Sequence, residues 1–127
     1  MEKEKVIQYW RESAQRDLGA ARDLIKLKHY NWALFVYHLA IEKLLKGQLV
    51  KSDKEIPPIH KLVRLAELSG LKITGEDRDN LLVITDFNLE ARYDDYKENF
   101  YRKATKEFTQ KWSDICERIY LWIDKQF

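Results

Sequence analysis

Apolar side chains recur along most of the chain at the spacing of one helix face. Between residues 4 and 27 they return every three to four positions, which predicts a long amphipathic helix. Similar spacing predicts a short helix over residues 59–69, a helix that starts at Thr74 or Asp77, and a last helix over residues 102–126. Gly70 is suited to end the short helix, because glycine adopts a left-handed backbone without strain. The pattern indicates an all-α bundle.

Residues 31–50 differ from the other predicted helices because they are apolar on almost every side. A helix of this kind is typical of the centre of a bundle, where neighbours cover all of its faces. Asn31 is an acceptable N-cap for it, since its side chain accepts a hydrogen bond from the first helical turn. We therefore expect this segment to be the central helix of the fold.

A narrow polar stripe interrupts that central helix. At about 100° per residue, His38, Glu42 and Lys46 fall within roughly 80° of one another, and Lys43 lies about 140° from His38. A buried charge needs a partner, water or a ligand. One interpretation is structural, with an ordinary Glu42–Lys46 pair and a hydrogen-bonded core histidine. The other is the wall of a ligand pocket, in which the ammonium groups face a phosphate and His38 faces a base or a hydroxyl.

The apolar spacing is lost over residues 92–101, which are rich in tyrosine and acidic residues and are predicted to be irregular. Arg92 follows the last apolar position of the preceding helix, so its guanidinium is held at the end of a packed element. Its planar fork suits a phosphate or a carboxylate. Asp94 and Asp95 are alternative partners for it, and both possibilities stay open.

Three further features are weaker indications of function. Several cations lie near the predicted start of the last helix, where they oppose the helix dipole; they are Lys97, Arg102, Lys103, Lys106 and Lys111. They are a solvated face or a weak basis for RNA binding. His60 is expected in the first turn of the short helix, packed on the preceding loop. Cys116 lies on a core stripe and is expected to be a buried, inert thiol.

Composition limits the class of protein. The 127 residues suit one domain, and four glycines and two prolines are too few for an all-β fold. A net charge of +2 does not by itself indicate nucleic acid binding. One cysteine excludes an internal disulfide, and the scattered histidines give no metal site and no cofactor motif. Without an apolar leader or membrane span, we expect a cytoplasmic protein that does not enter a membrane.

Four motifs, in order, resemble the HEPN domain, a small helical domain of prokaryotes described as nucleotide-binding. They are Tyr9-Trp10 with Ala14, Asp17-Leu18, Ala21 and Leu24; Tyr30-Asn31-Trp32-Ala33 with Ala40-Ile41-Glu42-Lys43-Leu44-Leu45-Lys46; Ile56-Pro57-Pro58-Ile59-His60-Lys61-Leu62; and Glu90-Ala91-Arg92-Tyr93-Asp94-Asp95. The closing Leu121-Trp122-Ile123 also fits. The resemblance covers essentially the whole chain, so residues 1–127 are expected to form a single HEPN-like domain.

The resemblance implies an up-and-down four-helix bundle with an additional short helix, usually as a homodimer. It also implies a subunit that pairs with a minimal nucleotidyltransferase encoded nearby, in a toxin–antitoxin or two-component modifying system. Glu42, Lys43, Arg92 and Tyr93 would then line a cleft for a nucleotide or another small-molecule substrate, beside Lys46 and His38. The metal and paired carboxylates of the transfer reaction would belong to the other chain.

The chain departs from the ribonuclease branch of that family, whose motif is an arginine followed four to six residues later by a histidine. No histidine follows Arg92, and His60 is the last one in the sequence. We therefore expect no catalytic activity from this chain alone. Two alternatives remain: a divergent ribonuclease toxin in which Arg92 works with Tyr96 or His38, and a purely structural or regulatory dimer.

Overall fold

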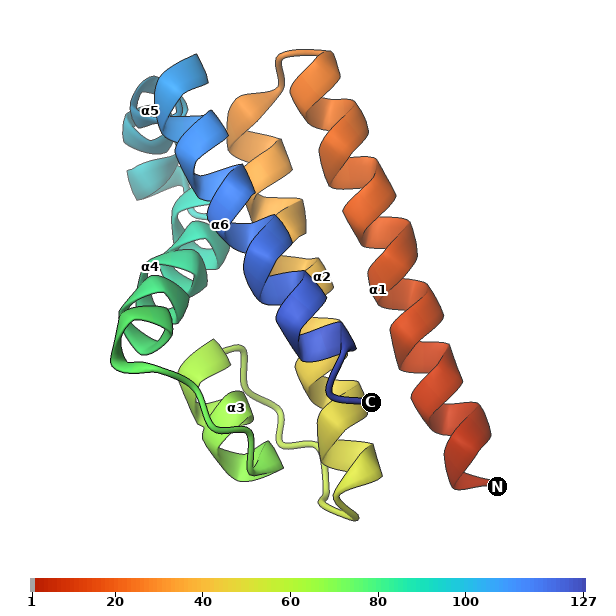
Figure 1. Cartoon of the computed structure of the whole chain (residues 1–127). Helices are drawn as coiled ribbons and strands as arrows, with labels where there is room; N and C mark the ends of the chain where they lie inside the picture. Colours follow the sequence, from red (N-terminus) through yellow and green to blue (C-terminus); the bar gives the residue numbers. More distant parts are fainter. Residues whose placement is uncertain (1) are drawn as a thin grey trace.

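The computed structural model describes residues 2–127, which form six α-helices and no strand. The helices are α1 (Lys3–Lys26), α2 (Tyr30–Lys51), α3 (Leu62–Ser69), α4 (Gly75–Arg92), α5 (Asp94–Lys103) and α6 (Lys106–Asp124). The longer helices α1, α2, α4 and α6 alternate in direction, and α3 and α5 are short additions at the two ends (Figure 1). The all-α fold is thus confirmed, with two short helices where one was expected.

Helix α2 is the central element of the bundle, as its apolar sequence predicted. It packs against α1, α3, α4 and α6, and it runs between α1 and α6 in Figure 1. Its fully buried side chains include Leu34, Ile41 and Leu45. The predicted cap at Asn31 is wrong, because the helix begins one residue earlier and His29 precedes it without a side-chain cap.

The prediction of an irregular segment over residues 92–101 is also wrong, because most of it is helix α5. Phe100 is its only buried residue, and it stacks on Phe87 of α4 with ring centroids 5.6 Å apart. A single buried position gives no visible apolar repeat. Asp94 and Asp95 in the first turn and Arg102 in the last turn suit the helix dipole, which favours this short helix.

Helix α6 consequently begins at Lys106 and not at Arg102, and Thr105 caps it by accepting a hydrogen bond from the Phe108 amide. The cations expected to oppose its dipole are therefore divided between two helices. Arg102 and Lys103 end α5, where cations are favourable. The positions of Arg102 and Lys103 therefore need no functional explanation.

Helix α3 begins at Leu62, three residues after its predicted start. Pro57, Pro58 and His60 lie in the loop before it, where the amide of Ile59 bonds to the carbonyl of Pro57. The predicted end at Gly70 is confirmed, with a left-handed φ of 81°. The Thr74 hydroxyl caps α4 by accepting a hydrogen bond from the Asp77 amide at 3.0 Å.

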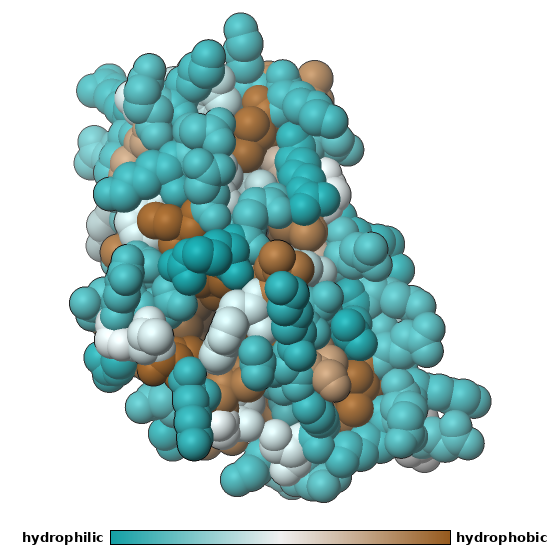
Figure 2. All heavy atoms as spheres, viewed as in Figure 1, coloured by the Kyte–Doolittle hydropathy of each residue, from teal (hydrophilic) through white to brown (hydrophobic). Residues whose placement is uncertain are grey.

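Charged and polar side chains cover most of the face in Figure 2, and apolar side chains reach the surface there only in separate small patches. Cys116 lies in the core with no exposed surface, and burial raises the pKa of its thiol. Within residues 2–127, no helix combines the length and the apolar character that crossing a bilayer requires.

Candidate functional site

The predicted polar stripe on α2 forms a compact cluster around the Glu42 carboxylate. Glu42 is 4% exposed, and its Oε2 accepts a hydrogen bond from the Lys46 Nζ at 2.8 Å. Its Oε1 accepts a hydrogen bond from the Nδ1 of His60 at 3.0 Å. Both oxygens are therefore neutralised by donors, which is what a buried carboxylate requires. The structural pair that the sequence allowed, Glu42 with Lys46, is present.

His38 is fully buried next to this carboxylate. Its Nε2 lies 3.3 Å from the backbone carbonyl of His60 and 3.6 Å from Oε1 of Glu42. Burial lowers the pKa of His38 below its ordinary value, against the opposing attraction of Glu42. We infer that His38 is neutral and donates its Nε2 proton to the carbonyl, since both neighbouring oxygens are acceptors. Its other ring nitrogen, Nδ1, has no partner within residues 2–127.

Arg92 ends α4, close enough to His38 for its charge to lower the pKa of that histidine further. Its Nε donates to the Asn88 carbonyl at 3.2 Å, and its guanidinium lies 5.7 Å from the ring centre of Tyr93. Arg92 forms no ion pair with any residue from 2 to 127: Asp94 pairs with Lys97, and Asp95 makes no ion pair within these residues. Arg92 is exposed, and the two amino groups of its planar fork have no carboxylate partner in these residues.

Lys43 lies apart from the Glu42 cluster. Its ammonium group pairs with Asp17 of α1 at 2.7 Å, and both side chains are less than a third exposed. Lys46 is also occupied, because it binds Glu42 and lies 5.7 Å from the ring centre of Trp10. The two ammonium groups expected to face a phosphate thus each have a partner within the bundle.

His60 is the member of the cluster that the sequence argument underestimated. The prediction that it lies in the first turn of the short helix is wrong, because α3 begins at Leu62 and His60 lies in the loop before it. Its ring contacts a buried carboxylate while 55% of its side chain stays exposed. Only the shared position of the Pro57-Pro58-Ile59-His60 motif in the resemblance indicated its importance. In residues 2–127, no group of three or more His, Cys, Asp and Glu side chains is arranged to hold a metal ion.

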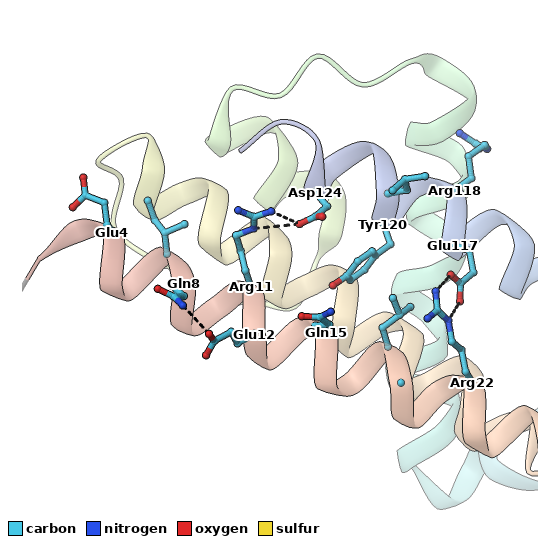
Figure 3. A pocket seen from close by; sticks show the side chains of 14 residues that line it. Glu4, Gln8, Arg11, Glu12, Gln15, Arg22, Glu117, Arg118, Tyr120 and Asp124 are labelled. Atoms are coloured by element: carbon cyan, nitrogen blue, oxygen red, sulfur yellow. Dashed lines mark hydrogen bonds and ion pairs between the residues drawn. The ribbon is translucent and has the colours of Figure 1, made fainter.

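A surface groove of about 1270 Å³ lies elsewhere, between α1 and α6 (Figure 3). Two arginines of α1 reach across it to carboxylates of α6: Arg11 binds Asp124 at 3.0 Å, and Arg22 binds Glu117 at 2.6 Å. None of the predicted site residues lines this groove. These two ion pairs hold α1 and α6 together, while Arg118 in the same groove pairs with Asp77 of α4.

Comparison with known proteins identifies the fold family. The sequence model of the HEPN domain matches residues 7–126. A solved structure described as ST0689, an archaeal HEPN homologue, is similar over 94% of this chain and 96% of its own, with a TM-score of 0.68 and 23% identity. No curated protein sequence matches the chain. Because the family match spans nearly all of the sequence, this chain belongs to the HEPN domain family.

Proposed function

We propose that this chain is a ligand-binding helical subunit that works with a minimal nucleotidyltransferase and has no catalytic activity alone. The observation that carries this proposal is Arg92, an arginine at the end of a packed helix that has no carboxylate partner in residues 2–127. Such a guanidinium is suited to a phosphate or carboxylate of a nucleotide or another small substrate. The family resemblance supplies the nucleotidyltransferase as partner.

The roles within the proposed site differ from residue to residue. Arg92 holds the anionic group, and the exposed ring of Tyr93 beside it offers a surface for a nucleobase or sugar. Glu42, Lys46 and His38 form the wall behind it. Lys43 reaches the ligand only by releasing Asp17, so its substitution should weaken binding least.

Isothermal titration calorimetry with ATP tests the binding role. The Arg92→Ala variant should bind about 10- to 100-fold more weakly than the parent protein, the loss typical of a charge-assisted contact. Arg102→Ala is the matched control, because Arg102 is an exposed arginine with only a surface pair to Glu98. Absence of heat and of thermal stabilisation with ATP, other nucleotides and aminoglycosides would favour the purely structural dimer.

Partner assembly is tested separately, by co-expression with the neighbouring open reading frame and size-exclusion chromatography. A nucleotidyltransferase that co-elutes in a fixed ratio supports the proposal; a neighbour of another class, or separate elution, contradicts it.

The homodimer is tested by size-exclusion chromatography coupled to light scattering. Leu82 and Leu89 are exposed two helical turns apart on α4 and support dimerisation through that face. Leu89→Glu should then yield monomers.

A ribonuclease remains a second candidate because Arg92 and Tyr96 are both exposed and lie four residues apart, on either side of the junction between α4 and α5. His38 is a poor partner for such chemistry, since its side chain has no exposed surface. Cleavage of total RNA that is lost in Arg92→Ala would support this candidate. Background-level cleavage by both proteins would dismiss it.

A further inference from the structure

His60 connects a buried carboxylate to solvent. Its Nδ1 lies 3.0 Å from Oε1 of Glu42, which is 6% exposed as a side chain, and 55% of the His60 side chain is exposed. The ring nitrogen on the other side, Nε2, makes no hydrogen bond within residues 2–127. The arrangement is that of a carboxylate behind an imidazole, with one nitrogen open to a reactant.

The hydrogen bond determines which nitrogen carries the proton. Glu42 is an acceptor at Oε1, so the Nδ1 of His60 must be the donor. In the neutral imidazole, Nε2 then holds the exposed lone pair. His38 has the opposite tautomer, because its Nε2 faces the His60 carbonyl and the same carboxylate. The two histidines therefore differ in role: His60 presents a base, and His38 presents none.

Hydrogen bonds from two helices hold the segment that carries this imidazole. His38 binds the carbonyl of His60, Glu42 binds its ring, and the amide of Leu62 donates to the Thr85 hydroxyl of α4 at 3.2 Å. Lys46 already neutralises the other oxygen of Glu42, so charge balance does not by itself call for an exposed histidine. Two helices, α2 and α4, thus hold the segment that carries this half-exposed ring, which is the preorganisation that proton transfer needs.

We propose that His60 is the proton acceptor for a hydroxyl group of the ligand whose anionic group Arg92 holds. This inference rests on the proposed function. The hydroxyl proton moves to Nε2 of His60, and the imidazolium that forms is stabilised through its Nδ1 proton by Glu42. The hydroxyl oxygen keeps the electron pair and forms a bond to the α-phosphorus of a nucleoside triphosphate on the partner chain, as the bond to pyrophosphate breaks. The proton then passes from His60 to solvent.

Acylation by diethylpyrocarbonate tests the base directly, since the reagent attacks the lone pair of a neutral imidazole nitrogen. The chain provides its own references: His29 is exposed, and His38 is fully buried. At pH 8, followed by peptide mass spectrometry, His60 should react several-fold faster than His29, and His38 should stay unmodified. In Glu42→Gln, which keeps an acceptor oxygen but removes the charge, His60 should slow to the rate of His29.

Two further measurements test the same inference without the Glu42→Gln variant. Nitrogen-15 shifts of the unmodified protein should assign the Nδ1–H tautomer to His60 and the Nε2–H tautomer to His38. AMP should protect His60 from acylation, and 2′,3′-dideoxy-AMP, which lacks the hydroxyls, should bind about three- to tenfold more weakly. His60→Asn, which retains a donor for Glu42 but has no Nε2, should bind both nucleotides equally.

The outcomes separate this inference from the function on which it rests. An Nε2–H tautomer at His60, or equal acylation of His60 and His29, overturns the inference even if AMP binds. Equal affinity of the parent protein for AMP and its dideoxy form also overturns it. Absence of binding by nucleotides and by aminoglycosides in calorimetry contradicts the proposed function and removes the proposed ligand, whatever the acylation rates are.

Discussion

The Glu42 carboxylate receives the His60 ring on one oxygen at 3.0 Å and the Lys46 ammonium on the other at 2.8 Å. Glu42 and Lys46 lie one turn apart on α2, whereas His60 comes from the loop before α3. The contact therefore ties that loop to the central helix.

Replacement of Glu42 by alanine should destabilise the protein by about 3 kcal/mol, because it leaves a largely buried ammonium group without its partner. Urea unfolding followed by circular dichroism measures this free energy. Glu98→Ala is the matched control, since Glu98 forms an exposed pair with Arg102 and should change stability by less than about 0.5 kcal/mol. Equal effects of the two substitutions would mean that the Glu42 cluster contributes nothing special.

The protein should lose stability as the pH falls below the ordinary histidine value of 6.5, because burial holds the pKa of His38 lower in the folded state. The unfolded chain then binds more protons than the folded chain, so the free energy of unfolding rises with pH in this window. Glu42 opposes the shift, and the charges of His60 and Arg92 add to it. Thermal unfolding between pH 5 and pH 8 checks the slope.

His38→Gln should flatten that slope, even though the variant is less stable overall. His29→Gln is the control, since His29 is exposed and its substitution should leave the slope unchanged. A further loss at lower pH is expected in all variants, because Arg22 lowers the pKa of Glu117 and Arg118 lowers that of Asp77. An unchanged slope in His38→Gln would contradict the assignment.

Tyr37→Phe should cost about 1–2 kcal/mol, because the buried hydroxyl donates to Glu117 Oε2 at 2.7 Å. Burial and this carboxylate both raise the pKa of Tyr37. Urea unfolding of the variant is compared with that of Tyr101→Phe, whose tyrosine is 64% exposed and should be neutral. A double substitution with Glu117→Gln should be less than additive, since both remove the same hydrogen bond.

Alanine should stabilise the protein at Gly19 but not at Gly47, although both glycines are helical. A Cβ at Gly19 meets nothing within 4 Å, so the gain in helix propensity of about 1 kcal/mol should be realised. At Gly47 the added atom would lie 3.0 Å from the Phe127 ring and 3.3 Å from the Trp10 Cβ, which requires neighbours to move. The melting temperature should rise in Gly19→Ala relative to the parent protein, and it should fall or stay unchanged in Gly47→Ala.

The helical fold could be predicted because its signals are local. The apolar spacing gave α1, α2 and α4 within a few residues, and Gly70 and Thr74 mark helix ends through backbone geometry and a neighbouring amide. Helix α5 could not be predicted in the same way. Its stability comes from the Phe100–Phe87 contact and favourable end charges, and a single buried side chain produces no repeat.

The candidate site, like the fold, was predictable only where its features depend on local sequence. By itself, the sequence determined that His38, Glu42 and Lys46 share one side of a central helix, because helix periodicity alone places them there. Only the tertiary structure decided their partners: Lys43 turns to Asp17 of α1, and His60 reaches Glu42 from a loop. A contact between elements depends on how helices pack and on where a loop ends, and no local pattern of residues records that.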